Sequence, residues 1–137
     1  MKIDKLIQGK DNQIIFGTIG SLLTDKKVHE ELGMAITSKD NDEWYVMYNG
    51  NDLLGFAVTR KTKSTKALHI RFLYLLDIDQ AHKFKKLLIK EIIKNATNDN
   101  LKAVWTNDRK KERAWKDLKF NFTERSRGEF GRWEKKL

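Results

Sequence analysis

Apolar and polar residues alternate along this chain with a period that switches several times between that of a strand and that of a helix. A period of two residues predicts strands over residues 2–7, 43–48, 53–60, 67–76, 101–106, 120–123 and 129–135. A helical period predicts helices from Asp11 to Leu23, from Thr24 or Asp25 to Leu32, over 81–94 and over 109–119. Hairpins and crossovers both occur in this order, so we expect one α/β (α+β) domain over residues 1–137 with a mixed sheet.

The strand over residues 67–76 is the longest of those predicted. Regular alternation gives it an apolar face formed by Leu68, Ile70, Phe72, Tyr74 and Leu76. The opposite face carries His69, Arg71, Leu73 and Leu75. Ahead of it, Asn49-Gly-Asn-Asp52 predicts a hairpin turn, and residues 61–66 predict a polar connection.

Polar residues and glycines mark the ends of the predicted helices. Asp11 is placed to cap the first helix, and Gly33 suits the left-handed position that ends the second. Asp77 and Gln80 have the spacing of an N-cap and its partner three residues later, which predicts a capping box before helix 81–94. Gly17 and Gly20 lie inside the first helix, where glycine costs roughly 1 kcal/mol relative to alanine unless it permits close packing.

The composition excludes several kinds of chemistry. The 137 residues include no cysteine, so a disulfide framework, a thiolate zinc site and a cysteine nucleophile are excluded. No two of the three histidines have metal-ligand spacing on a helix, and we expect no metal site. No apolar run approaches the ~20 residues that span a membrane. These features favour a cytoplasmic protein.

The charge of the chain is concentrated in its second half. Residues 1–59 carry a net charge of −3 and residues 60–137 one of +12. Such a basic half attracts polyanions or anionic cofactors, although a lysine-rich solvated surface has the same composition. The residues that suit nucleic-acid binding flank the 61–66 connection or lie near Phe130 and Trp133; they are Arg60, Lys61, Lys63, Lys66, Arg125, Arg127 and Arg132.

The last third of the chain resembles a known family. Helix 81–94 is followed by the strand Leu101-Lys-Ala-Val-Trp-Thr-Asn107 and then by Ala114-Trp-Lys-Asp-Leu-Lys-Phe120. This order is similar to the acyl-CoA-binding half of the GNAT superfamily of N-acetyltransferases. The resemblance implies a mixed, mostly antiparallel central sheet flanked by helices. It also implies transfer of an acyl group from acyl-CoA or another acyl donor to an amine.

The resemblance assigns cofactor contacts to particular residues. Main-chain groups at Leu73, Leu75 and Leu76 would hold the pantetheine arm, and the remaining contacts would come from Gln80, Ala81, His82, Lys83, Lys85 and Asn107. Two departures weaken the match. Residues 79–84 lack the glycines of the family's phosphate loop, and Trp115 replaces the tyrosine that commonly acts as an acid. We therefore expect weak or absent binding of acetyl-CoA.

The same resemblance points to catalytic candidates on the central strands. Either His69 or a water held by Glu43 would take the proton of the amine, and Tyr74 is a further candidate. A histidine in a strand is more often structural, so both interpretations stay open. The alternative is a catalytically departed GNAT-fold protein that binds or modifies nucleic acid, as phage Mom proteins do, or that binds a protein partner. The acceptor is not specified by the sequence.

Overall fold

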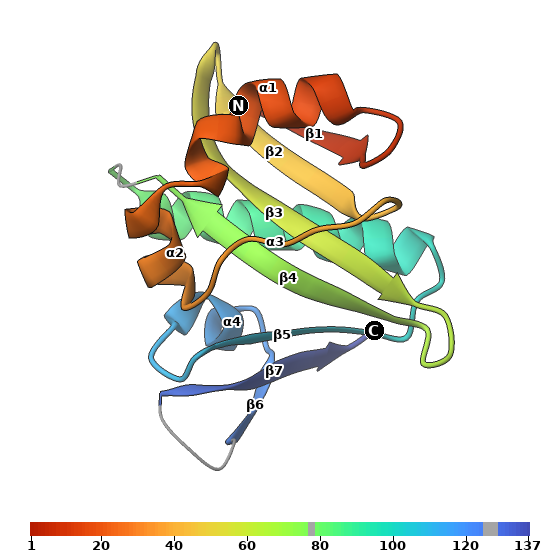
Figure 1. Cartoon of the computed structure of the whole chain (residues 1–137). Helices are drawn as coiled ribbons and strands as arrows, with labels where there is room; N and C mark the ends of the chain where they lie inside the picture. Colours follow the sequence, from red (N-terminus) through yellow and green to blue (C-terminus); the bar gives the residue numbers. More distant parts are fainter. Residues whose placement is uncertain (77–78, 125–128) are drawn as a thin grey trace.

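The computed structural model describes residues 1–76, 79–124 and 129–137 and contains one twisted central sheet (Figure 1). Within these residues the sheet has seven strands in the order β1-β2-β3-β4-β5-β7-β6, and every neighbouring pair is antiparallel except β4–β5. The strands are β1 (Lys2–Ile7), β2 (Glu43–Asn49), β3 (Asp52–Thr62), β4 (Ala67–Leu75), β5 (Ala103–Arg109), β6 (Asn121–Glu124) and β7 (Phe130–Lys136). The predicted mixed, mostly antiparallel sheet is confirmed.

Helices cover both faces of the sheet. They are α1 (Asn12–Leu23), α2 (Lys26–Leu32), α3 (Ala81–Asn98) and α4 (Arg113–Asp117). Figure 1 shows α3 behind the sheet and α1 in front of it. The α3-side core packs Leu88, Ile89 and Ile92 against β2, β4 and β5, and it includes Trp115 of α4. The α1-side core packs Ile15 and Ile19 against β2, β3 and β4.

Strand β4 contains an irregularity that the sequence pattern does not reveal. Val58 of β3 pairs with Phe72, but the next residue, Thr59, pairs with Ile70, so Arg71 has no partner of its own in β3. Such a bulge bends the strand and shifts the later side chains to the other face. Consequently Ile70 lies in the α3-side core, whereas Phe72 lies in the α1-side core. The prediction of a single regular apolar face over residues 68–76 is wrong for this reason.

The bulge coincides with the end of pairing between β4 and β5. Among the described residues these two strands pair only over Ala67–Ile70 and Ala103–Thr106. Beyond that point β4 continues against β3 up to Leu75, and β5 continues against β7 up to Arg109. The expected parallel pairing across the α3 crossover is confirmed, but the two strands separate beyond the bulge and leave an opening in the sheet.

The helix ends agree in part with the polar signals. Asp25 caps α2 by accepting from the backbone N–H groups of Lys27 and Val28, at 2.8 and 3.4 Å. Gly33 ends that helix with the expected left-handed backbone, at φ +82°. Asp11 precedes α1 as predicted, but its carboxylate accepts from the backbone N–H of Ile7 at 2.8 Å rather than capping the helix.

The predicted capping box before α3 is not formed as expected. Gln80 precedes the helix with φ +64°, so it does not occupy the third helical position, and its side chain does not cap the helix. Asp77 lies outside the described residues. The last helix is also shorter than predicted and begins only at Arg113, because β5 extends to Arg109 in order to pair with β7.

Arg60 and Lys61, which were expected on an exposed connection, lie in a strand and form ion pairs, although Lys61 is exposed as expected. The Arg60 guanidinium donates to both carboxylate oxygens of Asp42, at 2.7 and 2.8 Å, and Asp42 is only 1% exposed. Lys61 pairs with Asp99 at the end of α3, at 2.9 Å, and with Glu43 at 3.4 Å. Strand β3 extends to Thr62, so both residues lie within it. Lys63 is exposed in the turn, as expected.

Two glycine substitutions should have opposite effects on stability. A Cβ at Gly55 would lie 2.4 Å from the carbonyl oxygen of Tyr74, a backbone atom of the neighbouring strand, whereas a Cβ at Gly17 in α1 would meet nothing within 4 Å. We expect Gly17→Ala to raise the free energy of unfolding by about 0.5–1 kcal/mol. We expect Gly55→Ala to lower it by at least about 2 kcal/mol. Urea unfolding followed by circular dichroism measures both, and a neutral Gly55→Ala would contradict the close β3–β4 approach.

The Arg60–Asp42 pair gives a second stability prediction. Arg60→Ser leaves a buried carboxylate without its guanidinium partner, so we expect a loss of about 2 kcal/mol or more in the free energy of unfolding. Lys63→Ser is the matched control, because it removes the same charge from an exposed turn and should change stability by less than about 0.5 kcal/mol. Equal unfolding midpoints for the two variants would show that the pair contributes little.

Candidate functional site

Among the described residues, three neighbouring cavities follow the line along which β4 and β5 separate. The first, the α3 cavity, has a volume of about 480 Å³ and lies between the end of β4 and the start of α3. The second, the middle cavity, has a volume of about 190 Å³ and shares Leu73, Lys85 and Glu112 with the first. The third, the Arg71 cavity, has a volume of about 490 Å³ and shares Arg71, Phe72 and Asn107 with the second. The shared lining shows that the three cavities are adjacent, and we refer to the three together as the groove.

The α3 cavity has main-chain groups on both sides. One wall is the end of β4, with Leu73, Leu75 and Leu76, where the β5-facing edge no longer pairs with β5. The other wall includes Ala81 and His82 in the first turn of α3. That turn contains no acidic residue, and no side chain of Gln80 caps it. Backbone N–H groups and the positive end of the helix dipole are therefore available to an anion.

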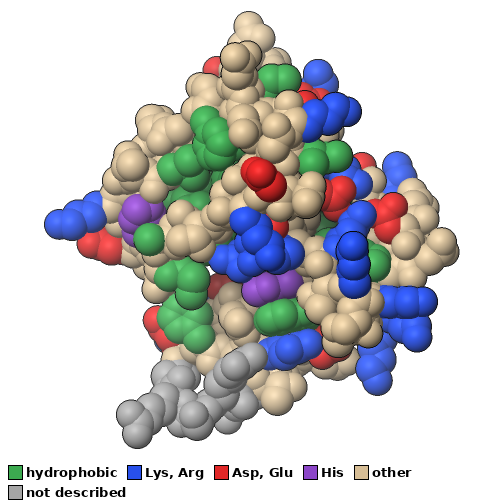
Figure 2. All heavy atoms as spheres, turned by 45° about the vertical axis from the view of Figure 1, so that its right-hand side comes forward, with side chains coloured by type: hydrophobic (Ala, Val, Ile, Leu, Met, Phe, Trp, Pro, Cys, Tyr) green, Lys and Arg blue, Asp and Glu red, His purple; other side chains and the backbone are tan. Residues whose placement is uncertain are grey.

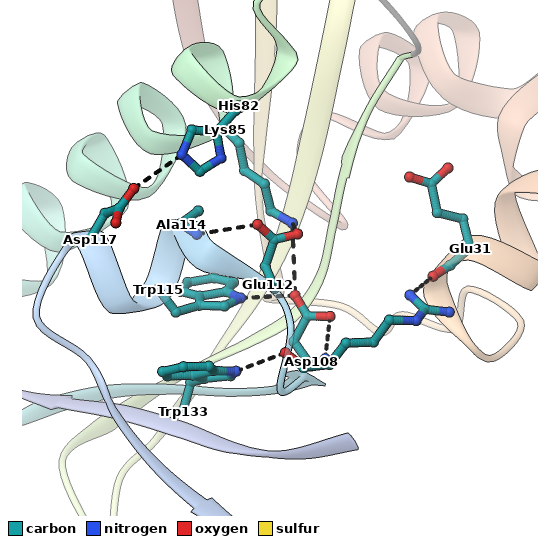
Figure 3. Close-up of polar contacts among 10 residues, drawn as sticks. Glu31, His82, Lys85, Asp108, Glu112, Ala114, Trp115, Asp117 and Trp133 are labelled. Carbon is teal, nitrogen blue, oxygen red and sulfur yellow. Dashed lines mark hydrogen bonds and ion pairs between the residues drawn. The ribbon is translucent and has the colours of Figure 1, made fainter. Parts of the chain in front are cut away.

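Two of the basic side chains that line this cavity, Lys85 and His82, lie beside acidic residues (Figure 3). Lys85 Nζ lies 2.8 Å from a carboxylate oxygen of Glu112 and 3.8 Å from Asp108, while His82 lies 3.1 Å from Asp117. Burial alone would raise the pKa of Glu112, but Lys85 and the backbone N–H of Ala114 outweigh it and hold this pKa below its ordinary value. Glu112 is thus a carboxylate at neutral pH, and an incoming anion must compete with it for Lys85.

Trp115 borders the middle cavity as a packed aromatic side chain. It is 1% exposed and packs edge-on against Phe120, with ring centroids 5.0 Å apart. Its indole N–H donates to Asp108 Oδ2 at 2.8 Å, as Figure 3 shows. An indole N–H is a donor only, and this one is already engaged. Trp115 therefore does not supply the acid that the resemblance would place here.

The Arg71 cavity lies beside a stack of three side chains from adjacent strands. The ring of His69 in β4 is stacked on Trp105 in β5, with centroids 3.7 Å apart and an interplanar angle of 3°. The guanidinium of Arg132 in β7 lies 4.1 Å from the centroid of the same indole. Because β5 lies between β4 and β7, His69 and Arg132 occupy opposite faces of Trp105.

The surroundings of His69 disfavour its protonated form. Burial, followed by the charges of Arg71, Arg60 and Arg132, lowers the pKa of His69 to about 4. The imidazole is therefore neutral at neutral pH. A general base works best with a pKa near the working pH, so His69 is poorly matched to the role that the sequence suggested.

The structure brings together most of the predicted cofactor residues but not the predicted catalytic ones. Leu73, Leu75, Leu76, Ala81, His82 and Lys85 all line the α3 cavity, and Asn107 lines the other two cavities, whereas Gln80 and Lys83 line none of the three.

Among the catalytic candidates, His69 lines the Arg71 cavity, and Tyr74 borders the α3 cavity while packing in the α1-side core. Glu43 pairs with Lys5 at 2.9 Å and lies beside the far end of α3, away from the groove.

Sequence reasoning missed three groove residues, Arg71, Asp108 and Glu112. Arg71 had a signal, since it is a charged residue within an otherwise apolar strand. Glu112 had a weaker one, as the single acid within the basic run from Arg109 to Arg113. Asp108 had none, because its role depends on contacts with Trp115 and Lys85 that only the fold creates.

The residues proposed for nucleic-acid binding do not form one free basic patch. Arg60 and Lys61 are ion-paired, and Arg132 stacks on Trp105 and lies 3.3 Å from Glu134. Lys63 and Lys66 are exposed in the β3–β4 turn, while Arg125 and Arg127 lie outside the described residues. Figure 2 shows a face on which Lys and Arg side chains gather around a histidine, with acidic side chains interspersed. Nucleic-acid binding stays a prediction.

The described part of the chain contains neither a candidate metal site nor a candidate membrane-spanning helix. It contains no group of three or more His, Cys, Asp or Glu side chains placed to hold a metal ion. None of its helices is long and apolar enough to cross a membrane.

The unusual pKa of His69 can be tested directly. We expect the imidazole signals of His69, assigned by comparison with His69→Gln, to titrate by NMR with a midpoint at about 4. The same histidine in the unfolded chain binds its proton near pH 6.5, so between these values the unfolded state binds more protons. The stability of the native protein relative to His69→Gln should therefore fall as the pH drops through this interval. A midpoint near 6.5 would contradict the burial and the three nearby guanidinium charges.

Comparisons with known proteins identify the fold. No protein-family model and no curated protein sequence matches the chain. An acetyltransferase from Bacillus subtilis, solved in complex with CoA, matches with a TM-score of 0.66 at 16% identity, covering 99% of each chain. The ribosomal-protein-S18-alanine N-acetyltransferase of Escherichia coli matches with a TM-score of 0.69 at 9% identity, covering 97% of this chain and 90% of its own. Tetrahymena GCN5 matches with a TM-score of 0.65 at 13% identity, covering 97% of this chain and 96% of its own. The chain has the fold of the GNAT N-acetyltransferases.

Proposed function

We propose that this protein is an acyltransferase that transfers an acyl group from an acyl-CoA to an amine. The observation that carries the proposal is the groove along the separation of β4 and β5, which runs from the first turn of α3 to the Arg71 cavity. The α3 cavity would receive the donor and the Arg71 cavity the acceptor, with the middle cavity between them. The structural likeness to N-acetyltransferases supports the same function at the level of the fold.

The residues of the α3 cavity suit the donor. An acyl-CoA would supply an activated thioester carbonyl for attack by an amine. Leu73 and Leu75 line the α3 cavity beyond the residues of β4 that pair with β5, and their main-chain groups would contact an extended amide-containing arm. The first turn of α3 offers free N–H groups, with His82 at the cavity wall and Lys83 exposed nearby, to phosphate oxygens.

The acidic partners of the cavity explain why we expect this binding to be weak. Lys85 is neutralised by Glu112 and lies near Asp108. Asp79, which is exposed just before α3, adds further negative charge close to the helix start. The glycines that would let the backbone approach phosphate are also missing from residues 79–84.

The electrostatics of the Arg71 cavity would help the acceptor to react without a strong protein base. Burial and the charges of Arg60, Arg71 and Arg132 lower the pKa of His69. The same influences lower the pKa of an amine bound beside them, because both disfavour a cation. The amine would then be present in its neutral, nucleophilic form at a lower pH than in water. The neutral imidazole of His69 can accept a hydrogen bond from it.

The charge balance of the α3 cavity predicts opposite effects for two substitutions. Lys85→Gln leaves Glu112 unpaired beside the donor and should weaken acetyl-CoA binding, while Glu112→Gln frees Lys85 and should strengthen it. Lys90→Gln, on an exposed position of α3, is the control and should change nothing. Isothermal titration calorimetry measures the dissociation constants, which we expect to lie above the low-micromolar range for the native protein.

Transfer itself can be followed by the thiol that CoA releases. The chain has no cysteine, so a thiol-reactive dye reports released CoA without a background from the protein. A panel of primary amines tests for acceptors, with heat-denatured protein as the control. No binding of acetyl-CoA at millimolar concentration, together with no thiol release for any amine, would refute the proposed function.

A further inference from the structure

We propose that the Arg71 cavity recognises an acceptor that has an apolar body and a carboxylate, with the carboxylate bound by Arg71. This inference names a substrate class, and the role of that substrate as an acyl acceptor rests on the proposed function. The binding of an acidic, apolar ligand in this cavity stands on its own observations, which concern the hydrogen bonds of Arg71, the charge around it and the walls of the cavity.

Arg71 has unused hydrogen-bonding capacity. It is the residue at the bulge of β4, and its side chain lines both the middle cavity and the Arg71 cavity. One terminal nitrogen donates to the hydroxyl of Thr37 at 2.9 Å, but Nε is buried and has no hydrogen-bond partner among the described residues. A buried donor without a partner is destabilising, so the native protein gains from an acceptor atom placed there.

Arg71 also lacks the acidic partner that neighbouring arginines have. Arg60 binds Asp42, Arg109 lies 3.4 Å from Glu129, and Arg132 lies 3.3 Å from Glu134. No carboxylate in the described part of the chain pairs with Arg71. Burial and then the charge of Arg60 lower the pKa of its guanidinium, and the carboxylate of Asp42 offsets this only in part. A bound carboxylate supplies the missing charge, and the planar fork of arginine accommodates it with two parallel bonds.

The other walls of the Arg71 cavity are mainly apolar. Leu32, Met34, Phe72 and Phe130 line it, together with Gly33 and Gly131, and its volume of about 490 Å³ lies in the range of ligand pockets. Met34 is 59% exposed at this site, so a flexible apolar side chain is available to cover a ligand. A single free cation within apolar walls suits a ligand with one negative charge better than a polyanion.

The stacked residues beside the cavity argue against nucleic acid as its ligand. Base stacking requires an aromatic face that is open, but both faces of Trp105 are covered, one by His69 and the other by Arg132. The cations next to Arg71 are likewise committed, since Arg60 holds Asp42 and Arg132 holds Glu134. Among the described residues, the site therefore offers one anion contact, from Arg71, rather than a series of phosphate contacts.

The test compares ligands in pairs: in each pair one ligand has a charged carboxylate where the other has a neutral amide. We would titrate para-(aminomethyl)benzoate and para-(aminomethyl)benzamide, and their meta isomers, into the full chain without any acyl donor, by calorimetry. At least one benzoate should bind about tenfold or more tightly than its benzamide, as a charge-assisted pair with arginine requires. Arg71→Gln should abolish this preference and Arg71→Lys should retain part of it. Lys94→Gln removes a charge from an exposed position of α3 and should leave the preference intact.

Three results would overturn the inference: equal binding of benzoate and benzamide, a preference that survives Arg71→Gln in a variant with native circular dichroism, or no binding by any of the four ligands. Different results would contradict the proposed function and the inference about Arg71. An Arg71-dependent preference without acetyl transfer would remove the transferase and keep the acidic-ligand site. Transfer at equal rates to benzoate and benzamide would keep the transferase and remove the preference.

Discussion

The feature on which the rest of the site depends is the extra residue in β4 at Arg71. It pairs with nothing in β3, so the strand bends and its later side chains change faces. As a result Ile70 packs under α3 while Phe72 packs under α1. Among the described residues, pairing with β5 ends at the same point, which opens the sheet beside the end of β4. The bulge also places Arg71 at the junction of two cavities. One local irregularity thus produces the groove and its cation.

The two ends of the groove differ in how their charges are balanced. At the start of α3, Lys85 is paired with Glu112 and lies near Asp108, so a donor must enter a region that is already neutral. At the other end, Arg71 has no acidic partner among the described residues, and two further guanidinium groups act on His69. This contrast predicts that the protein binds its acceptor through charge more than it binds its donor, since the free cation lies on the acceptor side.

The departures from the GNAT pattern have physical counterparts in the structure. Trp115 fills the tyrosine position with a buried ring whose N–H is engaged by Asp108, so it acts in packing rather than in proton transfer. The missing glycines before α3 remove one means of binding phosphate, but the first turn of the helix keeps its free N–H groups because no side chain of Gln80 caps it.

The sequence by itself determined the elements and much of their arrangement. Periodicity predicted the strands and the long helix, because the spacing of apolar residues within a short stretch determines the apolar face of each element. The resemblance in the last third predicted the parallel crossover around α3 and most residues of the α3 cavity.

Only the tertiary structure decided which side chains work together. The face of the sheet on which Phe72 lies depends on the register between β3 and β4. Register is a property of the two strands together, and the sequence pattern of either strand alone does not contain it. The pairing of Arg60 with Asp42 joins residues 18 apart, and that of Lys85 with Glu112 joins residues 27 apart. Arg71 has no carboxylate partner among the described residues for the same reason. The fold brings acids to the neighbouring arginines, whereas the guanidinium of Arg71 lies at a cavity.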